Sequence, residues 1–139
     1  MNNHFSVWLV PETSDKKYLE KIIEQLAAKY SSPIFVPHLT LLPDTNAGFN
    51  ELKIAIEQIF KDMRVFKVSV EGINQSEAFF KTVFIEFKRD ENLSELFKTF
   101  SQKTDGRDLS TFKPHVSLMY KILPENEKLK IISGLDIKN

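Results

Sequence analysis

One short string occurs twice in the sequence, and this repetition limits the folds that the chain can adopt. The string reads PHLTLL around His38 and PHVSLMY around His115. Trp8 precedes the first histidine by the same interval at which Ile85 precedes the second. Two copies with equal spacing favour one domain built as two halves related by an approximate twofold axis, and not a solenoid of many repeats.

Apolar residues recur with strand or helix spacing along the chain and predict the elements of each half. Phe66, Val68 and Val70 alternate with polar residues, which is the pattern of a half-buried strand. The polar residues 104–111 predict a loop before the second string. The predicted strands cover 5–10, 34–42, 64–73, 79–87 and 112–120, and the predicted helices cover about 15–30, 50–60, 93–100 and 124–133.

The composition excludes several classes of protein. The chain has no cysteine, which excludes disulfides, thiol nucleophiles and thiolate-bound metals and fits a reducing compartment. The 19 Lys+Arg balance the 19 Asp+Glu, so DNA is not an expected partner and a long RNA is a poor one. No apolar run reaches the roughly 20 residues of a membrane helix, and a signal peptide is not evident. We therefore expect a single domain, residues 1–139, in the cytoplasm and away from the membrane.

Each copy of the string places an imidazole beside a hydroxyl. Side chains at positions i and i+2 of a strand share a face, so His38 points with Thr40 and His115 points with Ser117. Two imidazoles with a pKa near 6.5 can serve as general base and general acid, and the hydroxyls can donate to phosphoryl oxygens. This set suits cleavage of a phosphodiester. Neither string contains a carboxylate, and no metal-ligand spacing occurs, so we expect no metal and no cofactor.

The bare pattern of histidine followed two residues later by Ser or Thr is weak. It occurs a third time, at His4 and Ser6, where a role in function is not expected. What distinguishes the two strings is the shared proline, aliphatic residue, hydroxyl and leucine around the histidine. The alternative interpretation is that both histidines are ordinary core residues.

The two strings resemble the motifs of the 2H phosphoesterase superfamily, whose members carry two H-x-[ST]-x motifs on symmetric lobes. Within it, the strings FSVWLVPE, FVPHLTLL, EAFFKTVFIEF and STFKPHVSLMY are most similar to those of cyclic phosphodiesterases. The resemblance implies an α+β fold in which two lobes of antiparallel sheet, about 1–75 and 76–139, line a central cleft with helices outside. It also implies that His38 and His115 act as acid and base while Thr40 and Ser117 hold the phosphate.

The second half departs from the pattern of the family. After the second motif only 19 residues follow Tyr120, and the strand that would mirror residues 64–73 would begin at about residue 141. We therefore expect the final strand of the second lobe to be missing. An open sheet edge can pair with another chain, so dimerisation through that edge is one expectation, while the oligomeric state itself stays open.

Four further residues are candidates for lining the cleft. Tyr120 matches an aromatic position that lines the cleft in the resembling proteins. Trp8 is able to stack on a nucleobase, although a core position is an equal alternative. Phe80 and Lys81 begin the predicted strand 79–87, and Lys81 is either a charge for a phosphate or a solvated residue at the end of a strand.

The sequence thus predicts a metal-independent cyclic phosphodiesterase. Its expected substrate is a small nucleotide, either a nucleoside 2′,3′-cyclic phosphate or ADP-ribose 1″,2″-cyclic phosphate, which is hydrolysed to a phosphomonoester. Three alternatives stay open. They are processing of short RNA ends or 2′,5′-phosphodiesters by an RNA ligase-like 2H protein, a nucleotide-binding module without turnover, and a structural protein that dimerises.

Overall fold

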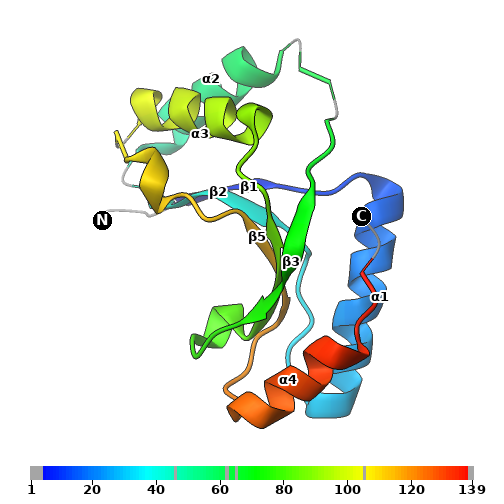
Figure 1. The fold of residues 1–139 in the computed structure, drawn as a ribbon. Helices are drawn as coiled ribbons and strands as arrows, with labels where there is room; N and C mark the ends of the chain where they lie inside the picture. Colours follow the sequence, from blue (N-terminus) through cyan, green and yellow to red (C-terminus); the bar gives the residue numbers. More distant parts are fainter. Residues whose placement is uncertain (1–4, 46, 62, 65, 105, 138–139) are drawn as a thin grey trace.

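The computed structural model describes residues 5–45, 47–61, 63–64, 66–104 and 106–137, so His4 lies outside the described residues. They form one sheet with helices packed around it (Figure 1). The strands are β1 (Phe5–Leu9), β2 (Leu39–Thr45), β3 (Val70–Gln75), β4 (Val83–Phe87) and β5 (His115–Met119). The helices are α1 (Thr13–Tyr30), α2 (Phe49–Phe60), α3 (Glu91–Lys103) and α4 (Glu125–Gly134), with short 3₁₀ turns at Phe79–Lys81 and Leu109–Thr111.

The sheet is antiparallel throughout and has the strand order β1-β2-β5-β4-β3. The predicted α+β class is therefore confirmed. The strands that carry the two motifs, β2 and β5, are neighbours at the centre of the sheet. Each motif strand has on its outer side the strand that precedes it in the chain, which is β1 for β2 and β4 for β5.

The two motif strands pair in the ladder at Leu39 in β2 and Val116 in β5. We call this pair the central pair. Its residues occupy the same position of the two strings, directly after the histidine, so the approximate twofold axis passes between them. Both side chains are buried, and because neighbours along a strand point to opposite faces, the residues on either side of them face the other way.

The symmetry of the halves extends to an irregularity in each ladder. The register of β1 against β2 shifts at Leu41, and the register of β4 against β5 shifts at Leu118. These leucines stand at equivalent positions of the two strings and have no partner in the ladder. Both are completely buried. A bulge bends a strand and re-aims the neighbouring side chains, and here it follows directly after the motif hydroxyl in both halves.

The register also corrects the alignment of the halves that equal spacing predicts. Trp8 pairs with Thr40, and its counterpart opposite Ser117 is Phe84. Ile85, which equal spacing would match with Trp8, is one position further along β4. The structural counterparts are therefore Trp8 and Phe84, both aromatic, and the lead-in to the second motif is longer by one residue.

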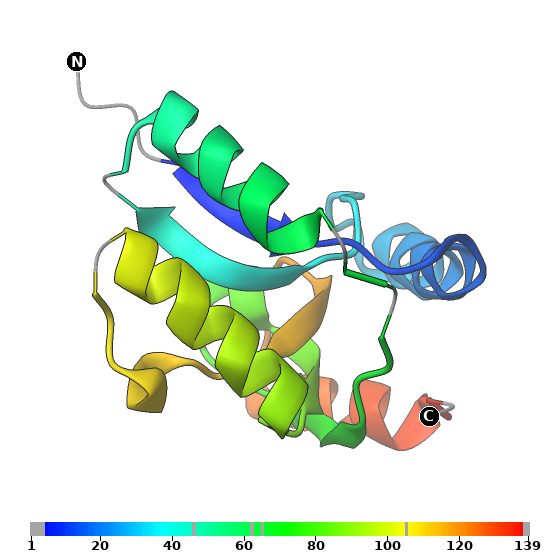
Figure 2. The same ribbon diagram turned by 90° about the horizontal axis from the view of Figure 1, so that it is seen from above.

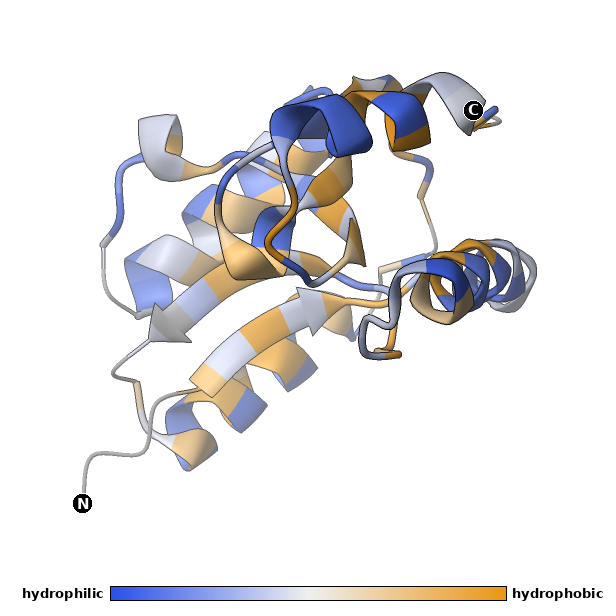
Figure 3. Cartoon of the chain, turned by 90° about the horizontal axis from the view of Figure 1, so that it is seen from below, coloured by the Kyte–Doolittle hydropathy of each residue, from blue (hydrophilic) through white to orange (hydrophobic). Residues whose placement is uncertain are grey.

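The helices pack across the boundary between the halves. Helix α1, from the first half, contacts β5, and α3, from the second half, contacts β2. Helices α2 and α3 lie side by side, while α1 and α4 lie on the other side of the molecule (Figures 1 and 2). The helices carry both hydrophilic and hydrophobic residues, as amphipathic helices on a core do (Figure 3). The largest fully buried apolar side chains are Ile23, Leu41, Leu42, Ile85, Leu93, Phe97, Phe100, Leu118 and Met119.

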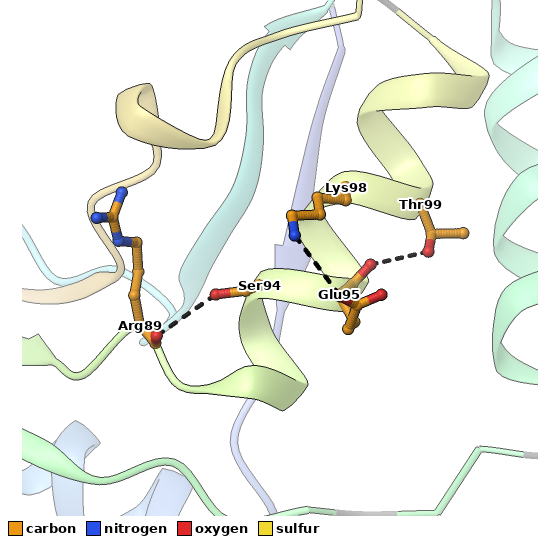
Figure 4. A network of polar contacts seen from close by, with 5 residues as sticks. All are labelled: Arg89, Ser94, Glu95, Lys98 and Thr99. Atoms are coloured by element: carbon orange, nitrogen blue, oxygen red, sulfur yellow. Dashed lines mark hydrogen bonds and ion pairs between the residues drawn. The ribbon is translucent and has the colours of Figure 1, made fainter.

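Helix α3 has an aspartate, Asp90, at its N-cap. The carboxylate of Asp90 accepts a hydrogen bond of 2.9 Å from the backbone N–H of Leu93, which satisfies one of the free donors of the first turn. A network of local contacts joins Arg89, Ser94, Glu95, Lys98 and Thr99 at the first turns of this helix (Figure 4). They include Lys98 with Glu95 at 3.6 Å, and such exposed pairs contribute little to stability.

Three strands begin at least four residues later in the structure than predicted. Residues 33–38 are not strand, because Pro33 and Pro37 have no N–H to give to a ladder, and β2 begins only at Leu39. Phe79–Lys81 form a 3₁₀ turn instead of the start of β4, and Thr82 closes this turn by donating to the Phe79 carbonyl oxygen at 3.1 Å. Strand β3 begins at Val70, later than the predicted residue 64.

The two edges of the sheet differ in their surroundings. Strand β3 forms one edge and lies beside α4, and β1 forms the opposite edge. A strand equivalent to β3 in the second half would pair with β1 at that edge. Within the described residues no strand follows α4. None of the described helices combines the length and the apolar character needed to cross a bilayer.

We expect the Leu118→Ala variant to lose about 2–5 kcal/mol of unfolding free energy, because Leu118 is fully buried at the bulge and truncation leaves a cavity. Urea denaturation measures this loss. The matched control is Leu129→Ala on α4, where the side chain is half exposed and the change should stay within about 0.5 kcal/mol. Equal stability of the two variants would show that the bulge is not part of the core.

Candidate active site

The four motif residues lie together where β2 meets β5. In an antiparallel pair, the residues next to a paired position oppose each other. The central pair therefore sets His38 across from Ser117 and Thr40 across from His115, on the face opposite to the buried leucine and valine. Each imidazole thus has one hydroxyl on its own strand and one on the neighbouring strand. The sequence predicted the first of these relations, and the structure adds the second.

Both imidazoles are held by the same backbone contact. Nδ1 of His38 lies 2.7 Å from the carbonyl oxygen of Val36, and Nδ1 of His115 lies 2.9 Å from that of Lys113. A carbonyl oxygen can only accept, so Nδ1 carries the proton and donates in both rings. Nε2 is then the nitrogen of each neutral ring that has a free lone pair.

The proline of each string explains this contact. Proline restricts the residue before it to extended backbone and fixes its own φ through its ring. The carbonyl two residues before the histidine is thereby presented to the ring. Pro37 and Pro114 are both buried, so the chain has little freedom to turn away. The recurring proline is thus the part of the string that orients the imidazole.

Different groups shift the pKa values of the two histidines. Burial lowers the pKa of His38 below its ordinary 6.5, against the opposing effect of the hydrogen bond to Val36. Burial also lowers the pKa of His115, and the hydrogen bond to Lys113 opposes it. The positive charges of Lys81 and His38 lower the pKa of His115 further, and Glu86 raises it. The charge of His38 therefore acts on His115, in keeping with their positions on either side of the central pair.

The two hydroxyls are not in equivalent states. Ser117 is almost fully buried, and its Oγ donates to the backbone oxygen of Phe80 at 2.7 Å. Among the described residues, Thr40 Oγ1 has no such bond and is partly exposed. Thr40 is therefore free to donate to a ligand, whereas Ser117 has to give up its hydrogen bond to the Phe80 oxygen before it can donate to one.

Trp8 lies against a motif histidine and not in the core. Its side chain is about half exposed (49%), and its ring stacks on that of His38 with centroids 3.6 Å apart and planes at 12°. The core alternative for Trp8 is therefore wrong. In the second half its counterpart Phe84 is buried and meets His115 edge-on, with centroids at 5.5 Å.

An aromatic cluster borders the second motif. Tyr120 stacks on Phe35 with ring centroids 3.7 Å apart, and Phe80 meets Tyr120 edge-on at 5.1 Å. Phe80 is 69% exposed and Tyr120 is partly buried, which raises the pKa of its phenol. The predicted candidates Tyr120 and Phe80 are thus brought together beside Ser117, and Phe35 joins them without having been predicted.

Lys81 lies beside His115. Its Nζ sits 4.4 Å from the centroid of the Phe84 ring, which in turn contacts the imidazole. Burial lowers the pKa of Lys81, the carboxylate of Glu86 raises it, and the charge of Lys113 lowers it. Lys81 is therefore not a simple solvated residue at the end of a strand.

Glu86 is a neighbour of the second motif histidine that the sequence analysis missed. It is the direct cross-strand partner of His115, and it accepts a hydrogen bond of 3.1 Å from the side chain of Asn74. Its position opposite His115 could have been found only from the register of β4 against β5, because the equal spacing of the halves aligns β4 with an error of one residue. Phe84 was missed for the same reason.

The described residues contain no group of three or more His, Cys, Asp or Glu side chains placed to hold a metal ion. A cavity of about 590 Å³ lies elsewhere, between the turn after β3 and the start of α4. It includes Ser76, Glu125 and Lys128 in its lining but none of the four motif residues. This cavity is therefore separate from the candidate site, which is defined by the paired imidazoles.

A sheet with two motif strands at its centre, each bearing an imidazole and a hydroxyl, is the arrangement of a 2H phosphoesterase. Comparison with known proteins agrees. The family model of the cyclic phosphodiesterase-like proteins matches residues 1–133. A cyclic phosphodiesterase of Arabidopsis thaliana is 25% identical over 124 residues, which are 89% of this chain and 68% of that protein. The chain belongs to the cyclic phosphodiesterase-like family, and the predicted enzyme class is confirmed.

The lowered histidine pKa values predict a pH dependence of stability. The unfolded chain binds more protons than the folded one between the unfolded pKa of 6.5 and the lower folded pKa. The stabilising contribution is therefore complete above about pH 6.5 and is lost as the pH falls through the folded pKa. We expect the unfolding free energy of the wild type to fall between about pH 7.5 and pH 5.5.

Urea denaturation at the two pH values measures this change. In the His115→Asn variant, which cannot take up this proton, the fall should be smaller. An identical fall in variant and wild type would contradict the prediction.

Proposed function

We propose that the chain hydrolyses a small nucleotide cyclic phosphate to a phosphomonoester without a metal or cofactor. The substrate is a nucleoside 2′,3′-cyclic phosphate or ADP-ribose 1″,2″-cyclic phosphate, and the reaction takes place in the cytoplasm. The family match supports the cyclic phosphodiester as the class of substrate. The residues that we assign to the reaction are His38, Thr40, His115 and Ser117.

The reaction needs one base and one acid. A water oxygen attacks phosphorus, the base removes a proton from that water, and the bond from phosphorus to one ribose oxygen breaks. The acid gives its proton to the departing oxygen, so that the product is an alcohol and a phosphomonoester. Thr40 and Ser117 donate hydrogen bonds to the two oxygens that are not in the ring, where negative charge increases.

One observation carries this proposal. Both imidazoles use Nδ1 to bind a backbone carbonyl, and both keep Nε2 for the reaction. A core histidine needs only one satisfied nitrogen in any orientation. Two rings held by the same contact at symmetric positions next to the central pair are the geometry that two-sided proton transfer requires.

The surroundings of the two rings favour a division of roles. The positive charge of Lys81 acts on His115 and disfavours its protonated form, whereas His38 has the face of Trp8 against it, which can stabilise a cation. We assign the base to His115 and the acid to His38.

The proposal predicts conversion of adenosine 2′,3′-cyclic phosphate by the purified protein in EDTA, followed by phosphorus NMR. The cyclic phosphate and the two possible monoesters give separate signals, so the same spectrum identifies the broken bond. His38→Ala and His115→Ala should each be slower by about 10²–10⁴-fold, the contribution of one general acid or base. Full activity in either folded variant, or strict dependence on an added divalent metal, would refute the mechanism.

The two hydroxyl variants should differ in stability. Thr40→Val keeps the shape of the side chain, breaks no internal bond, and should lose rate by about 10²–10³-fold with little loss of stability. Ser117→Ala also leaves the Phe80 carbonyl oxygen without its donor, so it should lose both rate and about 1–3 kcal/mol of unfolding free energy. Steady-state kinetics and urea denaturation of the two variants separate these effects. Equal stability would contradict the difference that we infer.

A second candidate is the end of a short RNA, or a 2′,5′-phosphodiester within one. The exposed aromatic rings of Phe79 and Phe80 beside Ser117 favour it, because aromatic faces stack on bases without regard to sequence. A dinucleotide that ends in a 2′,3′-cyclic phosphate tests this in the same NMR assay. Faster conversion than the mononucleotide supports an RNA end, and equal or slower conversion supports the small nucleotide.

A further inference from the structure

The surroundings of the two histidines break the symmetry of the halves. Continuing the register of β1 by one residue sets Val10 opposite His38, whereas the same position opposite His115 is the carboxylate Glu86. The causes that act on His38 are its burial and the backbone of Val36. His115 has in addition one cation and one anion on the neighbouring strand and turn.

Phe84 joins the cation to the histidine. Its ring face receives the ammonium of Lys81 at 4.4 Å, and its ring contacts His115 at 5.5 Å with an angle of 69°. The ring is buried, so it cannot move away from either partner. An ammonium over an aromatic face is attracted by the ring, and partial burial strengthens this attraction. Lys81 is therefore held beside the imidazole and not left free in solvent.

Glu86 is fixed by other contacts. It lies directly across from His115 in the ladder and accepts from the amide of Asn74, which stands on the next strand. Its charge acts on both Lys81 and His115. The carboxylate therefore opposes the effect of the ammonium at the same ring.

We propose that Lys81 and Glu86 are positioning residues that set the protonation of His115, Lys81 favouring the neutral ring and Glu86 the charged one, while neither of them acts directly on His38. This inference rests on the proposed function in one respect only, the role of the neutral His115 ring as the general base. Among the described residues this pair has no equivalent beside His38, so it makes the two imidazoles chemically unequal although both come from the same repeated string.

The other charged groups near His115 are accounted for. Lys113 precedes the histidine by two residues, offers it only a backbone oxygen, and is exposed at its side chain. Its charge acts on Lys81 but is not among the causes that act on His115. The remaining charge is that of His38, across the central pair. Lys113 is thus a matched control, a lysine close in sequence whose removal should have the smaller effect.

The test is an NMR titration of the imidazole Cε1–H signals, which needs no turnover and stays informative if the proposed function fails. Variants His38→Asn and His115→Asn assign the signals among the three histidines of the chain. In Lys81→Met the midpoint of His115 should move to higher pH, because a repelling charge is gone. In Glu86→Gln it should move to lower pH, because an attracting charge is gone.

The midpoint of His38 should move less than that of His115 in both variants, because it is affected only through the coupling between the two rings. Lys113→Met should move the midpoint of His115 less than Lys81→Met does. An unchanged midpoint of His115, a shift of the opposite sign, or an equal shift at His38 would overturn the proposal. If Lys81→Met does not fold, Glu86→Gln carries the same test with the opposite sign. Absence of turnover with the expected shifts would refute the proposed function and leave this inference standing.

Discussion

The pairing of Leu39 with Val116 is the contact on which the site depends. It is the point where the motif strands join, and it lies on the approximate twofold axis between the halves. Because the pair buries its own side chains, alternation along the strands turns all four motif side chains to the opposite face. A register shifted by one residue would bury the imidazoles and expose the aliphatic chains. The buried core beneath the site therefore fixes the relative positions of the four motif side chains.

Backbone carbonyl oxygens, and not side chains, accept the hydrogen bonds that orient three of the four motif side chains. The carbonyl oxygens of Val36 and Lys113 fix the tautomers of the two rings, and that of Phe80 holds Ser117. Backbone groups do not titrate, so this support is constant over the pH range in which imidazoles change charge. Among the described residues, the charged side chains that act on the two motif histidines, other than those histidines themselves, belong to the second half.

The sequence predicted the parts of the molecule that strand and helix periodicity encode. The four helices follow from that spacing, and the string around His38 and His115 led to the family, whose resemblance implied the α+β class. The contacts between distant strands were not predictable. Glu86 and Phe84 acquire their relation to His115 only through the register of β4 against β5, which a bulge shifts by one residue. The turn at Lys81 was missed because the apolar run of residues 79–87 hides the bonds that Thr82 makes to close it.

The crossed packing of α1 on β5 and of α3 on β2 affects how the chain can fold. A fragment that ends after β3 would hold α1 without the strand that it covers, and the remaining fragment would leave α3 equally uncovered. Neither part contains the contacts for a complete core, so folding has to wait until sequence segments far apart have met, and high contact order of this kind slows folding. During synthesis, the first half must remain incomplete until the ribosome has delivered β5.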